Sequence, residues 1–194
     1  IIVPQPGDPN IYFIFTVDTV VSSGQTSRGF NYSIVDMTLN NGLGAITSKN
    51  NNLLNFSSEK ITSTFKNPDG SSIWVITFAS NDGNTDSVFI GGGNYDPAAY
   101  NTFHAFEIDN SGVKTNSIKS ASGIANIGDR RGYLKISPDG KKLVCANTSS
   151  GTFLYDFDVE TGLVSNPKTL NLVDTSSGFW SSTNQGYGVE FSPN

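Results

Sequence analysis

The sequence predicts an all-β protein, a β-propeller fragment with about three four-stranded antiparallel blades plus the first strand of a fourth. Three observations predict this fold class. A turn-and-strand unit recurs along the chain, short runs of Phe, Tyr, Ile and Val alternate with connections rich in Asn, Ser, Thr and Gly, and long amphipathic helical stretches are absent. Short apolar runs separated by polar turns are typical of a chain built from many short strands.

The repeat is clearest at its turns. Ser137-Pro138-Asp139-Gly140 and Asn67-Pro68-Asp69-Gly70 each lead, five residues after the proline, into an apolar run. Proline presets φ at the first central position of such a turn, Ser or Asn caps it, and glycine accepts positive φ. Pro6 stands at the same offset before Ile11, and Pro193 follows the first strand of a fourth copy.

Each unit is expected to contain a first strand, a tight turn, a second strand, a third strand that ends at an aspartate, a glycine turn and an edge-like fourth strand. The approximate units are residues 1–60, 61–131, 132–186 and the truncated 187–194. The expected first strands are 1–3, 61–66, 133–137 and 187–192, the second strands 11–16, 73–77 and 143–148, the third strands 32–36, 103–109 and 153–158, and the fourth strands open at 41–43, 111–113 and 161–164. The second strands lack strict alternation, which indicates burial on both faces.

The lengths of the connections differ between the two ends of the blades. In a four-stranded blade, the connections after strands one and three lie at one end, and here they are tight. The connections after strands two and four lie at the other end, and they are long: 17–29, 48–60, 79–99, 118–131 and 170–186. Insertions that collect on one face of a rigid scaffold usually mark the binding face. We therefore predict that ligand contacts come chiefly from 79–99, 118–131 and 170–186.

Composition narrows the classes of partner. The net charge is -5 and only 15% of the residues are charged, so no nucleic-acid partner is expected. No apolar run is long enough to predict a membrane span. The single cysteine, Cys145, lies inside an apolar strand and is expected to be buried. Because the chain opens without methionine and stops inside a repeat, we expect it to be an excerpt whose missing blades belong to the same parent protein.

The order of the motifs resembles a known group of proteins. The N-terminal propeller region of large secreted Bacteroidetes proteins is similar to this chain in the strings Ile2 to Gly7, Asn10 to Asp18, Tyr32 to Leu39 with Gly42 to Gly44, Glu59 to Thr62, and Ile73 to Thr77. Those proteins commonly carry PKD-like modules and a gliding-motility-associated or type IX secretion sorting domain at the C-terminus. The resemblance implies an extracellular or cell-surface propeller without assigned catalytic residues.

One loop has the oxygen-rich pattern of a cation site. Asp82, Asn84 and Asp86 present side-chain oxygens at alternate positions, and Asp96 on the same insertion could complete a calcium site. An EF-hand loop would carry glutamate at its twelfth position, which here is Gly93. The alternative is a polar loop without metal. No other cofactor is expected.

Two further segments could contact an organic ligand. The paired arginines Arg130 and Arg131 could clamp a carboxylate or sulfate, although solvent-facing charges are the alternative. Phe179 and Trp180 stand in a polar loop and could stack on a sugar or peptide, or pack over the end of the blade. His104 is the only histidine, which excludes a histidine-based metal cluster and favours a surface or packing role.

Two functions from different classes fit these observations. The first is a non-enzymatic extracellular binding or interaction propeller for a glycan or protein ligand, part of a larger secreted or cell-surface protein. The alternative is a propeller-type hydrolase or metal-dependent lactonase, because the fold alone does not fix function. The sequence assigns no catalytic residue.

Overall fold

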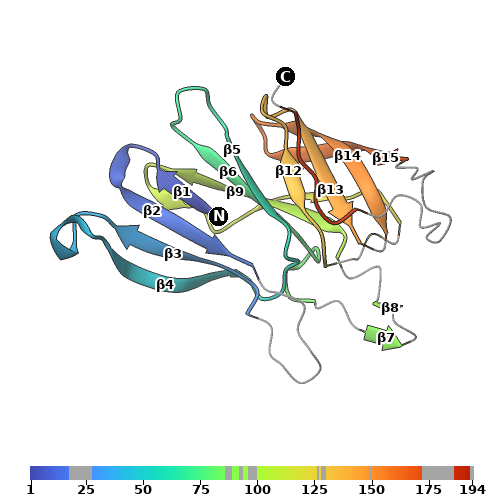
Figure 1. Cartoon of the computed structure of the whole chain (residues 1–194), viewed down its shortest axis with the longest axis horizontal. Helices are drawn as coiled ribbons and strands as arrows, with labels where there is room; N and C mark the ends of the chain where they lie inside the picture. The colour runs from blue at the N-terminus through green and yellow to red at the C-terminus, as the bar shows by residue number, and fades with distance from the viewer. Residues whose placement is uncertain are drawn as a thin grey trace.

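A computed structural model describes residues 1–17, 28–85, 89–91, 94–95, 100–125, 127, 130–148, 150–171 and 186–192. It confirms the predicted fold class: the chain is an all-β propeller fragment in which three antiparallel sheets follow one another along the sequence (Figure 1). Helical structure in the described residues is limited to the 3-10 turn η1 (Asn40–Gly42). No helix in this part of the chain has the length and apolarity needed to cross a membrane.

Within each sheet the strands neighbour one another in sequence order, as blades of a propeller do. The first sheet contains β1 (Ile2–Gln5), β2 (Asp8–Thr16), β3 (Phe30–Asp36) and β4 (Ala45–Leu54). The second contains β5 (Ile61–Phe65), β6 (Ile73–Ala79), β9 (Thr102–Asp109) and an outer strand divided into β10 (Gly112–Val113) and β11 (Ile118–Ala121). The third contains β12 (Leu134–Ile136), β13 (Lys142–Asn147), β14 (Gly151–Asp158) and β15 (Leu163–Leu170). A hairpin of β7 (Phe89–Gly91) and β8 (Asn94–Tyr95) lies between β6 and β9 in the sequence.

Two hydrophobic clusters hold the three sheets together, one at each interface between neighbouring sheets. Strand β6 contributes to both, because alternate residues of a strand point to opposite faces. The side chains shared with the third sheet are Trp74, Ile76 and Phe78, and those shared with the first are Ile73, Val75 and Ala79. Every residue of β6 is buried, as the absence of polar alternation predicted.

Burial on both faces does not extend to the second strand of the first sheet. Phe13 and Phe15 are buried against the second sheet, whereas Tyr12 and Ile14 on the opposite face are partly exposed. The reason is that no other sheet among the described residues covers that face. The prediction that second strands are buried on both faces therefore holds for β6 and β13 and is wrong for β2.

The fourth strands also differ from the sequence prediction. Residues 41–43 are not strand, since Asn40 and Asn41 adopt positive φ and form η1, and β4 begins only at Ala45. β4 then runs to Leu54 through part of the predicted loop 48–60, and β11 occupies the start of the predicted loop 118–131. Both are edge strands, whose solvated polar residues resemble a loop in the sequence.

The expected first strand of a fourth unit is not a strand in the structure. Residues 186–192 run beside β12, where the Tyr187 carbonyl accepts a 2.8 Å hydrogen bond from the Tyr133 backbone N–H. A strand requires a partner ladder, and the described residues supply none for this segment. The fold class otherwise follows the prediction, with three complete blades.

Candidate functional site

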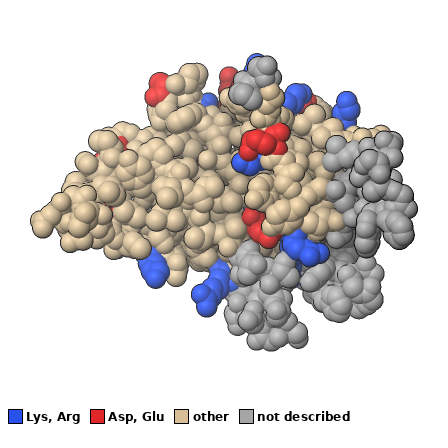
Figure 2. All heavy atoms as spheres, viewed as in Figure 1, with Lys and Arg blue, Asp and Glu red and all other residues tan. Residues whose placement is uncertain are grey.

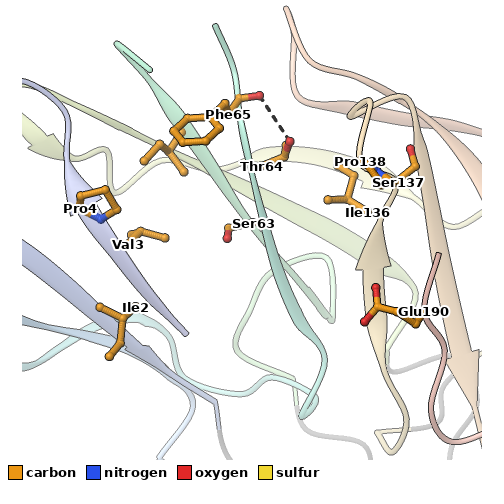
Figure 3. Close-up of a pocket in the computed structure, with 11 residues that line it drawn as sticks. Ile2, Val3, Pro4, Ser63, Thr64, Phe65, Ile136, Ser137, Pro138 and Glu190 are labelled. Carbon is orange, nitrogen blue, oxygen red and sulfur yellow. Dashed lines mark hydrogen bonds between the residues drawn. The ribbon is translucent and has the colours of Figure 1, made fainter. Parts of the chain in front are cut away.

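The first strands of the three blades, β1, β5 and β12, border one space, which we call the channel, with a tight-turn end and a long-loop end. β5 lies beside β12, and residues from β1, β5, β12 and Glu190 surround a cavity of about 380 Å³ (Figure 3). This cavity lies at the tight-turn end of the channel. Its wall combines apolar side chains with hydroxyl groups: Ile2, Val3, Pro4, Phe65, Ile73, Ile136 and Pro138 with Ser63, Thr64 and Ser137. A volume and lining of this kind suit a small ligand with an apolar face.

The one carboxylate of the cavity is neutralised by a neighbour. Glu190 lies 2.8 Å from the ammonium of Lys135, and this hydrogen bond holds the pKa of Glu190 below its usual value. Charged side chains are sparse elsewhere too. On the face in Figure 2, acidic and basic side chains stand in small separate groups within a mostly uncharged surface.

The long-loop end of the channel carries a pair of exposed aromatic rings. The centroids of Tyr133 and Tyr187 are 5.4 Å apart, with 56° between the ring planes. The two side chains are 47% and 51% exposed. Tyr133 directly precedes β12, and Tyr187 stands at the corresponding place in the fourth unit, near the start of segment 186–192. We call these two rings the tyrosine platform.

The backbone around the tyrosine platform is fixed by several hydrogen bonds. Tyr133 donates its N–H to the Tyr187 carbonyl, and its own carbonyl accepts from the Ala146 N–H at 2.9 Å. The Gly132 N–H donates to the Glu59 carboxylate at 2.8 Å. Gly132 has φ of 122°, and a Cβ there would lie 2.1 Å from the Ala146 carbonyl oxygen. Only glycine fits this approach of two backbone segments.

Two charged side chains adjoin the platform. The Glu59 carboxylate accepts a hydrogen bond from the Tyr187 hydroxyl, which raises the pKa of that phenol, while the nearby charge of Arg131 acts in the opposite direction. Glu59 therefore has donors on both sides, Tyr187 and the Gly132 N–H. The Arg131 side chain is exposed to solvent.

Two buried cations lie close to these residues in the fold. Lys60 is fully buried, donates from Nζ to the Arg131 carbonyl at 3.0 Å and lies 5.9 Å from the Phe78 ring centroid. Arg130 is 8% exposed, and its guanidinium carbon lies 5.6 Å from the ring centroid of buried Tyr100. Burial of a cation is costly unless nearby groups compensate it, and here a carbonyl oxygen and two aromatic rings lie beside the charges.

The structure places the predicted organic-ligand residues in different situations. Arg130 is buried and packs on the ring of Tyr100, and its role as a ligand contact remains a prediction. Phe179 and Trp180 lie outside the described residues, so their role remains a prediction. Among the described residues, the tyrosine platform is an exposed aromatic pair at the long-loop end.

The described part of the predicted calcium loop is a hydrogen-bonded turn. One oxygen of Asp82 accepts from the Ser80 hydroxyl and from the Asn84 and Thr85 N–H groups, and the other accepts from the Thr85 hydroxyl. These bonds, the Asn84 N–H first, lower the pKa of Asp82. The Asn84 amide donates to the Asp82 carbonyl and accepts from Asn55.

Calcium binding at this loop therefore remains a prediction. Asp86 and Asp96 lie outside the described residues. Within the described residues, no group of three or more His, Cys, Asp or Glu side chains is arranged to hold a metal ion.

The packing role expected for His104 is confirmed. Its side chain is fully buried, with Nε2 2.8 Å from the Ser80 carbonyl and Nδ1 2.9 Å from the Ser117 hydroxyl. Cys145 is likewise buried, as predicted. Neither residue lies among those that form the tyrosine platform.

Sequence reasoning missed Glu59, Tyr133 and Tyr187. A signal for the tyrosines was present, because each opens the first strand of its unit, as Tyr-Leu-Lys-Ile-Ser-Pro and as Tyr-Gly-Val-Glu-Phe-Ser-Pro. Glu59 has no comparable signal, since it joins the site only through the fold.

Comparisons with known proteins add solved structures of similar fold. No protein-family model and no curated protein matches the chain. A luciferin-regenerating enzyme is 17% identical with a TM-score of 0.43, covering 88% of this chain and 46% of its own. A Bacteroides fragilis protein provisionally assigned as a 6-phosphogluconolactonase is 13% identical with a TM-score of 0.49, covering 90% and 40%.

A periplasmic gluconolactonase from Pseudomonas aeruginosa is 13% identical with a TM-score of 0.42, covering 84% of this chain and 39% of its own. The chain thus spans less than half the length of each of these structures. At these identities the likeness is one of fold.

Proposed function

We propose that this chain is a ligand-binding part of a β-propeller that takes a sugar ring on the tyrosine platform. The observation that carries the proposal is the pair of half-exposed rings of Tyr133 and Tyr187, held 5.4 Å apart at the long-loop end of the channel. Exposed aromatic faces contact the apolar face of a sugar, and their hydroxyls bond its rim. The Glu59 carboxylate, which accepts from the Tyr187 hydroxyl, supplies a polar group beside them.

The rigidity of the platform supports binding. The hydrogen bonds to Tyr133 and Gly132 order the backbone before any ligand arrives. A site that is ordered in advance loses less conformational entropy when the ligand binds. Our proposal thus places the glycan ligand expected from the sequence on Tyr133 and Tyr187 and not on Phe179 and Trp180.

The test is calorimetric titration of the chain with a panel of monosaccharides and short glycans. Tyr133→Ala and Tyr187→Ala should each weaken binding by about tenfold, the effect of one aromatic contact. Phe65→Ala is the matched control, since it removes an exposed ring at the opposite end of the channel and should leave affinity unchanged. Binding that survives both tyrosine substitutions but is lost in Phe65→Ala would move the site to the tight-turn cavity.

The hydrolase or lactonase alternative is tested on the same site. Two of the structures of similar fold are described as lactone hydrolases, which is the reason to keep this alternative beside the proposal. A sugar lactone is incubated with the chain, with and without calcium, and acid release is followed. We expect no turnover above the spontaneous rate. Turnover that Glu59→Gln or Asp82→Asn abolishes would replace the binding proposal with the enzymatic one.

A further inference from the structure

We propose that the tight-turn cavity is a second binding site, and that it takes a small neutral molecule with an apolar ring and one hydrogen-bonding group. The tight-turn cavity is the space of about 380 Å³ that β1, β5, β12 and Glu190 surround. Ser63 and Phe65 of β5 contact this ligand. The site lies at the opposite end of the channel from the tyrosine platform, so the inference does not depend on the proposed function.

The apolar wall of the cavity comes from all three blades. Val3 belongs to β1, Phe65 to β5 and Ile136 to β12. In the view of Figure 3, Ser63 of β5 stands between Val3 and Ile136. The Phe65 ring is 60% exposed, although aromatic side chains are usually covered. Exposed apolar surface around a cavity of this volume is the surface that a ligand with an apolar face would bury.

Three hydroxyl groups line the cavity, and two of them already donate hydrogen bonds within the protein. The Ser137 hydroxyl donates to the Asp139 carboxylate at 2.6 Å. The Thr64 hydroxyl donates to the Phe65 carbonyl at 3.5 Å (Figure 3). The Ser63 side chain makes no hydrogen bond to another described residue. Its hydroxyl is therefore left to bond the one polar group of a ligand.

The charge around the cavity favours a neutral ligand. Among the described residues that line it, the charged side chain is Glu190, and the Lys135 ammonium lies 2.8 Å from its carboxylate. Glu190 would repel an anion, and a cation would compete with Lys135 for the same carboxylate. An ion would also lose hydration against the apolar wall. A sugar is disfavoured for a related reason, because most of its hydroxyls would find no partner there.

The experiment compares three probes that share a naphthalene ring and differ in charge: 2-naphthylmethanol, 2-naphthoate and 2-naphthylmethylammonium. Equilibrium dialysis against the chain measures the dissociation constant of each probe. The neutral alcohol should bind about tenfold more tightly than either ion, because only the ions lose the hydration of a charge. Equal affinity for the three probes would overturn the assignment of a neutral ligand.

Variants test the two residues that contact the ligand. Phe65→Ala should weaken the binding of 2-naphthylmethanol about tenfold, since it removes a ring contact. Ser63→Ala should weaken it by about threefold to tenfold, the effect of one hydrogen bond, whereas Ser63→Thr keeps the hydroxyl and should bind as the parent chain does. Tyr187→Ala, at the long-loop end, is the control and should leave the affinity unchanged.

The remaining outcomes separate this site from the sugar site. Absence of binding of 2-naphthylmethanol would overturn the inference and leave the sugar proposal standing. Binding that Tyr187→Ala weakens and Phe65→Ala does not would place the probe on the tyrosine platform and overturn the site. Unchanged affinity in Ser63→Ala would overturn the role of the Ser63 hydroxyl.

Discussion

The indole N–H of Trp74 donates a 2.7 Å hydrogen bond to the backbone carbonyl of Val159, and this bond joins the second blade to the third. The Trp74 side chain is buried in the cluster shared by the two blades. Gly162 packs against its ring, since a Cβ at that position would lie 2.9 Å from the indole. One side chain therefore links two neighbouring sheets through both a hydrogen bond and close packing.

Replacement of Trp74 by phenylalanine should destabilise the chain by about 1 to 3 kcal/mol, because the partly buried Val159 carbonyl loses its donor. The free energy of unfolding is measured by urea titration. Leu43→Ala, at a side chain 79% exposed, should change it by less than about 0.5 kcal/mol. Equal stability of the two variants would show that the bond between the blades contributes nothing.

Gly132→Ala should disrupt the tyrosine platform, because the new Cβ would meet the Ala146 carbonyl oxygen and the backbone has positive φ. We expect lower thermal stability and weaker sugar binding. Gly188→Ala is the matched control beside Tyr187, since a Cβ there meets no atom within 4 Å. If both variants bind as the parent does, the platform does not depend on the Gly132 backbone.

The order of strands could be predicted from the sequence, and the site could not. The turns at Pro68 and Pro138 could be predicted because proline and its neighbours favour a turn before an apolar run. In the structure these turns precede β6 and β13. Tyr133, Tyr187 and Glu59 meet only when three connections converge at the channel. A local pattern contains no information on such a convergence.

Lowering the pH should reduce the free energy of unfolding through the buried His104. Burial, the largest effect, lowers the pKa of His104 below its ordinary value of about 6.5. The unfolded chain therefore binds the proton first, so stability is complete above about pH 6.5 and falls as the pH drops toward the folded pKa. His104→Gln should flatten this part of the pH profile of the unfolding free energy.

The carboxyl groups affect the free energy of unfolding at lower pH than His104 does. Hydrogen bonds, that of Ser111 first, lower the pKa of Asp109 to about 2, so its contribution is present at neutral pH and lost only in stronger acid. If the unfolding free energy of His104→Gln falls near pH 6 as steeply as that of the parent chain, the pH dependence does not come from His104.

Asp82→Asn should lower the thermal midpoint, because asparagine accepts fewer of the four hydrogen bonds that Ser80, Asn84 and Thr85 donate. The decrease should be the same in calcium and in chelator, since the bonds are internal. A calcium-dependent rise in the midpoint of the parent chain, absent from Asp82→Asn, would instead establish the calcium site predicted from the sequence.

The outer face of the first blade should drive self-association. The register pairs Ile2 with Ile14 and Val35 with both Tyr12 and Ile46, all on the side away from the second sheet. Ile2 and Ile46 are 65% and 54% exposed. In stacked sheets such a face is normally buried by the next blade, so another copy of the chain should occupy it when no blade is available.

Sedimentation velocity measures this association. The parent chain should form larger species as its concentration rises, and Ile46→Lys should shift the distribution to monomer, because a buried ammonium is costly at such a contact. Leu163→Lys, an exposed leucine of the third blade, is the matched control and should leave association unchanged. A parent chain that stays monomeric at every concentration would show that this face is tolerated in water, and the first blade would then need no neighbour.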